Sequence, residues 1–261
     1  MSEINAHHNF ALLARRMLSD YDAKVPGSLF GEGLRLSIAD AFKLQTAVTR
    51  LREQRGEKVV GYKIGCVAPV NQRNFGVEHP VWGRLWSTEQ HADGASLNKN
   101  DFFKLAIEGE YAIKLNRDVD PGDCSIDSIV RCVGSVVPVI ELHNVRFSGE
   151  PPNGHELIAN NAIHAGVVAP RGVENPHRSF TTDLALLFDG EVVDSWKALE
   201  WPGEILKFVP WLVATLAENG EKLNSGDSIL TGAFGPPVPL NEHRRVAVVS
   251  SDFGRVEATF R

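Results

Sequence analysis

Three glutamates stand at positions where strands would bring their carboxylates together. Glu108 and Glu110 are two residues apart in a segment, Ile107 to Leu115, that alternates polar and apolar residues. Side chains at positions i and i+2 of a strand point to the same face of a sheet, so these two carboxylates must lie close together. Paired carboxylates repel each other and raise each other's pKa unless a cation neutralises them. A hard divalent cation such as Mg²⁺, Mn²⁺ or Ca²⁺ is the simplest partner, because it takes oxygen ligands and leaves positions open for substrate oxygens.

Glu141 is the third candidate, because it interrupts the apolar run Val136-Val137-Pro138-Val139-Ile140-Glu141-Leu142. A charge in such a run is costly to bury without a partner. His143 shares the face of Glu141 if the strand continues, where most histidines are core residues or supports for a ligand. The alternative for Glu108-x-Glu110 is a solvated strand face, which is the commoner meaning of this spacing. The lone glutamate in the apolar run favours the metal site.

Lys63 is a candidate catalytic residue in Val59-Val60-Gly61-Tyr62-Lys63-Ile64-Gly65. Glycines allow a backbone to approach a ligand closely, and a lysine there can supply a positive charge or a proton. The alternative is a lysine at a strand end whose head group lies in solvent.

Strands must hold these residues, and the chain after residue 90 is rich in strand patterns. Alternation with a period of two predicts a strand over 107–115, and 136–145 is a second strand candidate. Further strands are expected beside turn residues: 184–195 about Asp189-Gly190, 228–231 after Gly226-Asp227, and 245–260 about Asp252-Phe253-Gly254.

The first ninety residues or so carry helical periodicity instead. Apolar residues recur at spacings of three and four in two segments: Phe10, Leu13, Met17 and Tyr21, then Ala41, Leu44, Val48 and Leu51. Ser37 with Asp40 resembles a capping box and predicts the start of the second helix, which stops at Arg55-Gly56. A later helix is expected over 202–218, with Pro210 as a kink.

The order of elements, helices first and then mostly strands, predicts an α+β fold rather than alternating βαβ units. The 261 residues suffice for one large domain with an appendage. No internal repeat or low-complexity linker separates the two parts. We therefore expect a helical N-terminal part over 1–90 that packs on a core domain over 91–261.

The composition indicates an ordinary globular protein. With 27 Lys+Arg against 33 Asp+Glu the formal net charge is −6, and no basic run offers a site for nucleic acid. No apolar stretch is long enough to span a bilayer and no secretory signal pattern is present, so a cytoplasmic location without a membrane partner is expected. The three cysteines, Cys66, Cys124 and Cys132, lack CxxC spacing and are expected to be reduced and buried. The motifs of serine hydrolases, nucleotide hydrolases and dinucleotide-dependent dehydrogenases are absent from the sequence.

From about Leu36 onward the chain resembles the 2-keto-4-pentenoate hydratase and 4-oxalocrotonate decarboxylase branch of the fumarylacetoacetate hydrolase superfamily. Several blocks agree in order and spacing, which is more specific than any single motif. These blocks are LSIADAFKLQ (36–45), GEKVVGYKIGC (56–66), FGVEHPVWGRLW (75–86), IEGEYAIKLNRDV (107–119), VVPVIELHNVRF (136–147), LIANNAIHAGVV (157–168) and GDSILTGAFG (226–235). The resemblance implies a mixed β-barrel-like or β-sandwich-like catalytic domain over 91–261, and assembly into a homo-oligomer.

The resemblance also implies roles for individual residues. The implied ligands of a Mg²⁺ or Mn²⁺ ion are Glu108, Glu110 and Glu141. Lys63 would act as an acid/base or electrostatic catalyst. The implied substrate-binding residues are Arg146, Asn160 and Thr231.

The implied enzyme is a lyase of aromatic meta-cleavage catabolism. A 2-oxo acid or its dienol can chelate the cation through its carboxylate and C2 oxygen, and positive charge there stabilises an enolate. A hydratase protonates a 2-hydroxy-2,4-dienoate at its far carbon and adds water to the resulting enone, whereas a decarboxylase releases carbon dioxide into the same dienolate. Lys63 could hold or relay the proton in either path if burial lowers its pKa toward neutrality.

Three positions depart from the pattern of this branch. Val81 stands where hydratases usually carry an aspartate and decarboxylases an apolar residue. Asn144 and Asn160 stand where aspartates are usual, so Arg146 is expected to pair differently. We expect a hydratase, with a decarboxylase of 2-oxo-3-enedioates of the 4-oxalocrotonate type as the close alternative because of Val81. A non-catalytic binding or scaffold protein is the alternative of a different class, which the two asparagines favour mildly and the glutamates oppose.

Overall fold

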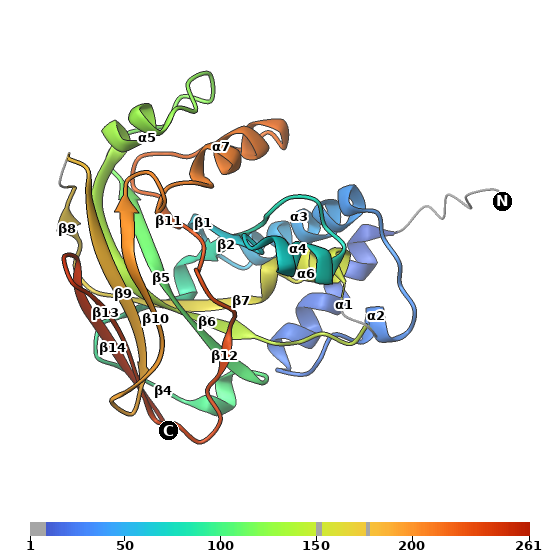
Figure 1. The fold of residues 1–261 in the computed structure, drawn as a ribbon. Coiled ribbons are helices and arrows are strands. Elements are labelled where there is room, and N and C mark those ends of the chain that lie inside the picture. The colour runs from blue at the N-terminus through green and yellow to red at the C-terminus, as the bar shows by residue number, and fades with distance from the viewer. Residues whose placement is uncertain (1–8, 150–152, 176–177) are drawn as a thin grey trace.

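The computed structural model describes residues 9–149, 153–175 and 178–261. Its helices are α1 (Phe10–Asp22), α2 (Ser28–Gly31), α3 (Ile38–Gln54), α4 (Pro69–Phe75), α5 (Ile126–Cys132), α6 (Gly154–Ala159) and α7 (Val209–Glu218). In Figure 1 the first four helices and α6 gather on one side of the β-sheets, while α5 and α7 lie together at the top. None of the helices in these ranges has the length and apolar composition needed to cross a membrane.

Two sheets form the centre of the molecule. Their strands are β1 (Val59–Gly65), β2 (Val81–Trp86), β3 (Gln90–Ala92), β4 (Ala95–Leu97), β5 (Leu105–Leu115), β6 (Val133–Asn144), β7 (His164–Ala169), β8 (Val173–Glu174), β9 (Phe180–Phe188), β10 (Glu191–Trp201), β11 (Ser228–Leu230), β12 (Val238–Pro239), β13 (Arg245–Ser250) and β14 (Gly254–Phe260).

The larger sheet is curled into a half-barrel. Its strand order is β2-β1-β11-β5-β6-β7-β3, with β12 paired to β5 and β8 paired to β6. The curl brings β2 against β7, and side chains from five strands pack together inside it: Leu85, Ala112, Val139, Val167 and Leu230. This architecture confirms the predicted α+β class and the barrel-like sheet that the family resemblance implies.

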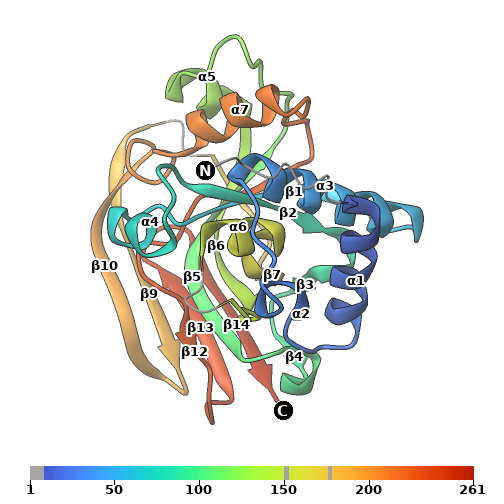
Figure 2. The same ribbon diagram turned by 90° about the vertical axis from the view of Figure 1, so that its right-hand side faces the viewer.

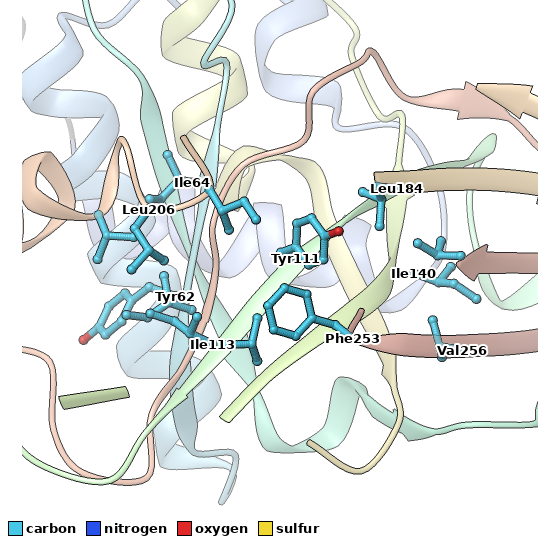
Figure 3. Close-up of a cluster of buried hydrophobic side chains, with 14 of the residues drawn as sticks. Tyr62, Ile64, Tyr111, Ile113, Ile140, Leu184, Leu206, Phe253 and Val256 are labelled. Atoms are coloured by element: carbon cyan, nitrogen blue, oxygen red, sulfur yellow. The ribbon is translucent and has the colours of Figure 1, made fainter. Parts of the chain in front are cut away.

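The smaller sheet, of order β10-β9-β13-β14-β4, packs on the outer face of β5 and β6. Ile107, Tyr111 and Ile113 of β5 are fully buried in the core between the sheets. Figure 3 shows the rings of Tyr111 and Phe253 meeting there, with centroids 5.5 Å apart in an edge-to-face arrangement. Because strand side chains alternate, this packing turns the even-numbered residues of β5, including Glu108, toward the opposite face.

Most predicted elements are confirmed. The strand predicted over 107–115 is β5 and the one over 136–145 is β6. Asp189 and Gly190 form the predicted turn between β9 and β10, with φ of +51° and +99°. Ser37 caps α3 by accepting a hydrogen bond from the backbone N–H of Asp40 at 3.0 Å.

Two expectations are wrong in detail. The helix predicted over 202–218 begins only at Val209, so Pro210 occupies its first turn instead of kinking it. Proline is tolerated there because the first N–H groups of a helix have no partner within the helix. The three free cysteines are half-buried rather than buried.

The helical side and the sheets share strands from the first ninety residues. β1 and β2 precede residue 90, yet both belong to the larger sheet. Figure 2 shows α6 in front of β5 and β6, with α1 and α3 beside it. The division into 1–90 and 91–261 stays a prediction about domain organisation.

Candidate metal centre and active site

The register between β5 and β6 sets the positions of the acidic residues. Glu108 lies directly opposite Glu141 in the antiparallel pair, and Ala106 lies opposite His143. The alternation of strand side chains places Glu108, Glu110, Glu141 and His143 on the same face, away from the core between the two sheets. The structure thus brings together three acids and a histidine from two strands.

Lys63 joins this cluster from β1. Its Nζ lies 3.2 Å from Oε1 of Glu141 and donates a hydrogen bond of 3.5 Å to the carbonyl of Ala162. The lysine is only 2% exposed. This arrangement excludes the alternative of a solvent-exposed lysine at a strand end.

Two histidines contact the acids. Nε2 of His143 lies 2.9 Å from Oε2 of Glu108 and 3.5 Å from Oε2 of Glu141. Nδ1 of His164 lies 2.7 Å from Oε1 of Glu141. Glu141 is fully buried, so it is held between Lys63 and both imidazoles without contact with solvent.

A loop after β11 holds the remaining glutamate. Oε2 of Glu110 accepts a hydrogen bond of 2.7 Å from the backbone N–H of Gly232. The preceding residue, Thr231, donates its backbone N–H at 3.0 Å and its hydroxyl at 3.1 Å to the carbonyl of Tyr111. The Thr231 side chain, which the family resemblance assigns to substrate binding, thus fastens this loop to β5.

The excess of carboxylates dominates the electrostatics of the cluster. Burial alone would lower the pKa of Lys63, but the charges of Glu141, Glu108 and Glu110 outweigh it and raise that pKa above its usual value. A lysine that titrates near neutrality is therefore not a property of the chain by itself. Burial would likewise lower the pKa of His143, but Glu141 and Glu108 raise it to about 9.

The two fully buried glutamates shift in opposite directions. Burial raises the pKa of Glu110 well above its usual value, and the charges of Glu141 and Glu108 add to this effect. Burial opposes ionisation of Glu141 too, but Lys63, His143 and a hydrogen bond with His164 together hold its pKa well below the usual value. Within the chain alone, Glu141 is the ion partner of Lys63, and Glu110 has no cation of its own.

These residues fit a divalent cation. Oε1 of Glu110 and Oε2 of Glu141 are buried without a hydrogen-bond partner, which is costly for carboxylate oxygens. Glu108, Glu141 and His143 each present a ligand atom within 4.8 Å of the others. An oxygen-rich set with one available imidazole suits a hard or borderline dication.

A cavity of about 340 Å³ opens over the cluster. Lys63, Glu108, His143 and Asn71 supply polar groups to its wall. The rest of the wall is mostly apolar and includes Phe75, Val81, Val145, Phe147, Leu157, Pro236, Pro237 and Pro239. This cavity can therefore bind a small molecule with a polar head at the acids and an apolar remainder.

An unusual backbone turn supports Lys63. Asn161, Ala162 and Ile163 have φ values of +55°, +50° and +56°, a left-handed conformation that is costly for residues other than glycine. Asn161 holds the turn against β2: its Oδ1 accepts from the N–H of Arg84 at 2.7 Å, and its Nδ2 donates to the carbonyl of Arg84 at 2.9 Å. Such strain often marks functional sites. No residue pattern in the sequence singles out Asn161, whose only local signal is the tolerance of asparagine for this conformation.

Arg146 and Asn160 lie apart from Lys63. They line a smaller cavity of about 40 Å³ together with Asn144 and His164. His164 stands between this cavity and the acid cluster, because its Nδ1 faces Glu141.

Relatives of known name cover most of the chain, although no family model matches it. It is 29% identical over 222 residues to a 2-keto-4-pentenoate hydratase from Burkholderia vietnamiensis, which covers 84% of this chain and 85% of that protein. It is 26% identical over 227 residues to a 4-oxalocrotonate decarboxylase from Pseudomonas putida, with 86% of each chain covered.

Solved structures share the fold. A 4-oxalocrotonate decarboxylase from Pseudomonas putida G7, complexed with magnesium and adipate, superposes with a TM-score of 0.86 at 24% identity over 97% of both chains. A fumarylacetoacetate hydrolase family protein from Yersinia pestis superposes with a TM-score of 0.57 at 15% identity, over 77% of this chain and 92% of that one. The chain is therefore similar over most of its length to proteins named 2-keto-4-pentenoate hydratase and 4-oxalocrotonate decarboxylase, and it shares its fold with a solved fumarylacetoacetate hydrolase family protein.

Proposed function

We propose that this protein is a metal-dependent lyase that hydrates small 2-hydroxy-2,4-dienoates, as in aromatic meta-cleavage catabolism. The observation that carries the proposal is the buried excess of carboxylates beside Lys63, at the polar end of an otherwise apolar cavity. The names of the relatives support the same class of reaction.

Glu108, Glu110 and Glu141 would hold the cation, with His143 at their side. Mg²⁺ or Mn²⁺ suits these ligands. When bound, a dication supplies positive charge for the carboxylate and the C2 oxygen of a 2-oxo acid, where negative charge develops in the reaction.

Lys63 and Glu108 would transfer the protons of the reaction. Lys63 is held by Glu141 and the carbonyl of Ala162, so its ammonium group can deliver a proton to a substrate carbon above it. Glu108 borders the cavity beside His143 and can accept a proton from water as that water adds to the enone. The apolar wall keeps bulk water away from the polar head of the substrate.

Decarboxylation of a 2-oxo-3-enedioate is the second candidate, and Val81 is the observation that favours it. Val81 contributes an apolar surface to the cavity at the position where a hydratase of this branch usually has an acid. A carboxylate that leaves as carbon dioxide loses its charge, so an apolar wall destabilises the reactant more than the transition state. The relatives are named as hydratases and decarboxylases, so we set the non-catalytic alternative aside.

The two reactions can be separated with purified protein and Mg²⁺. We would offer 2-hydroxypenta-2,4-dienoate and, separately, 2-oxohex-3-enedioate, and follow diene absorbance and carbon dioxide release. Loss of absorbance with the first substrate and no gas from the second supports the hydratase; gas from the second without turnover of the first supports the decarboxylase. Turnover of neither substrate would refute both proposals.

A matched pair of variants tests the role of Lys63. Lys63→Met should abolish turnover, whereas Lys114→Met, which removes an exposed lysine of β5, should leave it unchanged. Equal activity in both variants would remove Lys63 from the mechanism. The homo-oligomer and the cytoplasmic location stay predictions, the first of which sedimentation of the purified protein would test.

A further inference from the structure

A second cavity, with a wall that is mostly apolar, lies behind the candidate metal centre. Its volume of about 40 Å³ is several times the space that one water molecule needs, roughly 10–15 Å³ on the same measure, and is far below the 340 Å³ of the larger cavity. The polar groups in this wall include those of Tyr21, Trp86, Asn144, Arg146 and His164. The space suits a monatomic ion or a few waters and excludes a substrate of five carbons.

Arg146 is a buried cation in this wall without an acidic partner. It is 4% exposed. Its Nη2 donates to the carbonyl of Val25, and its guanidinium lies over the ring of Tyr21, 5.1 Å from the centroid. Among the residues that the structure describes, no carboxylate forms an ion pair with it; Asp20 and Asp22 act on it only through longer-range charge.

Arg52 lies in the same wall and, unlike Arg146, forms ion pairs with acids. It donates to Glu57 at 2.8 Å and contacts Glu89 at 2.5 Å. Glu89 also accepts from the hydroxyl of Tyr21 at 2.7 Å. These acids are engaged with Arg52 and Tyr21, and neither of them lines the cavity.

The wall also presents N–H donors that lack acceptors. Nε of Arg146 and Nε1 of Trp86 are buried without a hydrogen-bond partner. Unpaired buried donors are costly, and an unpaired buried cation is costlier still. Donors and a positive charge around a space of ionic size are the properties of an anion site.

We propose that this cavity binds a small monovalent inorganic anion of the chloride class, with Arg146 as its counter-ion and the indole N–H of Trp86 as a further donor. The anion neutralises the guanidinium of Arg146. It thereby stabilises the packing of α1 and α3 against the start of β7, where His164 lies. This site takes no part in the proposed reaction, so its test uses binding and stability rather than turnover.

The anion can be detected in the intact Mg²⁺-loaded protein. Sodium chloride would be exchanged for sodium gluconate at constant ionic strength, because gluconate is too large for the cavity. We expect chloride to raise the unfolding temperature by about 3 °C near ten times the dissociation constant, the shift that ligand linkage gives a chain of this size, and to raise it further with the logarithm of its concentration. Bromide in a crystal should give an anomalous peak beside Nε of Arg146. Equal unfolding temperatures in both salts, or bromide at the protein surface only, would overturn the proposal.

A variant with a built-in negative charge separates an anion site from a water-filled cavity. Asn144 accepts a hydrogen bond from the backbone N–H of Phe103 at 2.9 Å, and Asn144→Asp keeps that acceptor while adding a carboxylate to the wall. We expect this variant to lose the chloride response and to unfold in gluconate near the temperature at which the parent unfolds at ten times the chloride dissociation constant. A full chloride response in Asn144→Asp would contradict the proposal.

Removing the arginine gives the complementary test. Arg146→Met should lose both the chloride response and the bromide peak, while Arg131→Met, at a side chain that is 63% exposed, should retain both. If Arg146→Met fails to fold, the result for Asn144→Asp decides. A bromide peak that persists in folded Arg146→Met would place the anion on other residues and refute the proposed site.

Discussion

Among the residues that the structure describes, the charge cluster at the end of α3 and the one on β5 and β6 differ in their balance. At the end of α3, Arg52 pairs with Glu57 and Glu89, and Arg55 pairs with Glu57 as well. Each carboxylate there accepts a hydrogen bond from a guanidinium. This cluster links the end of α3 to the residues before β1 and after β2. Its carboxylates are neutralised by guanidinium groups of the chain, although Oε2 of Glu89 has no hydrogen-bond partner.

The cluster on β5 and β6 is unbalanced. Its three carboxyl groups outnumber the two groups that can carry positive charge, Lys63 and His143, and buried oxygens of Glu110 and Glu141 remain without a hydrogen-bond partner. Buried charges are stable when matched, and a surplus of one sign requires an external ion. A surplus of carboxylates, rather than the mere presence of buried acids, therefore distinguishes a metal centre from a structural ion pair.

Among the variants that distinguish the two clusters, Glu110→Gln should have the largest effect on turnover. Glutamine keeps the acceptor for the N–H of Gly232 and removes one negative charge. We expect turnover to fall roughly 10³-fold, because the charge stabilisation that a bound cation supplies amounts to several kcal/mol. The rise in unfolding temperature caused by Mg²⁺ should disappear, while the metal-free variant should be at least as stable as the parent because repulsion is reduced.

The control for this variant is Glu257→Gln, at an exposed acid of β14. It should change neither turnover nor the response to Mg²⁺ in thermal unfolding. A Glu110→Gln protein that keeps its Mg²⁺ response would show that the surplus of carboxylates does not serve a cation.

Glu57→Gln should lower the stability of the fold and leave catalysis unchanged. It removes the charge-assisted hydrogen bonds from Arg52 and Arg55, so we expect a loss of roughly 2–3 kcal/mol in the free energy of unfolding. Urea unfolding measures this loss. Turnover per folded molecule and the response to Mg²⁺ should be unchanged. A selective loss of turnover would contradict a purely structural role for the cluster at the end of α3.

Asn161→Ala should impair the positioning of Lys63 in the cluster on β5 and β6 and leave the cluster at the end of α3 unchanged. Without its two hydrogen bonds to Arg84, the left-handed turn relaxes and the carbonyl of Ala162 no longer holds Lys63 in place. We expect kcat to fall about 10-fold, equivalent to about 1.4 kcal/mol, with little change in KM. Asn161→Asp, which keeps the acceptor for the N–H of Arg84, should recover part of the rate; a change in KM alone would contradict this positioning role.

The smallest effect concerns acid stability. Burial would raise the pKa of Glu57, but its hydrogen bonds and the charge of Arg52 outweigh burial and hold that pKa below the usual 4.5. The resulting stability is complete above that value and is lost as the pH falls through the lower folded-state pKa. The difference in urea midpoint between the parent and Glu57→Gln should therefore be larger at pH 6 than at pH 3, and a constant difference would be inconsistent with this assignment.

Local patterns in the sequence predict the centre of the fold well. Alternation along 107–115 is a property of single strands, so the common face of Glu108 and Glu110 follows from the sequence alone. The family resemblance implied that Glu108 and Glu141 hold the same cation. Their pairing depends on the register of two strands, which neither the resemblance nor local spacing specified.

Other features depend on contacts between distant segments. The left-handed turn at Asn161 is held by Arg84, 77 residues earlier in the chain, and no local motif predicts it. The start of α7 at Val209 and the place of β1 and β2 in the larger sheet likewise follow from packing. The separation of Arg146 from Lys63 into a different cavity is of the same kind, because the two side chains belong to opposite sides of His164.

The register of β5 against β6 has a consequence for folding. A slip of one residue along β6 would turn every side chain of that strand to the other face, moving Glu141 into the core between the sheets and Ile140 into the acid cluster. A misaligned pair would therefore lose its hydrophobic packing and its ability to bind a cation in the same step. Correct alignment is selected twice, by the core on one face of the strands and by the acid cluster on the other.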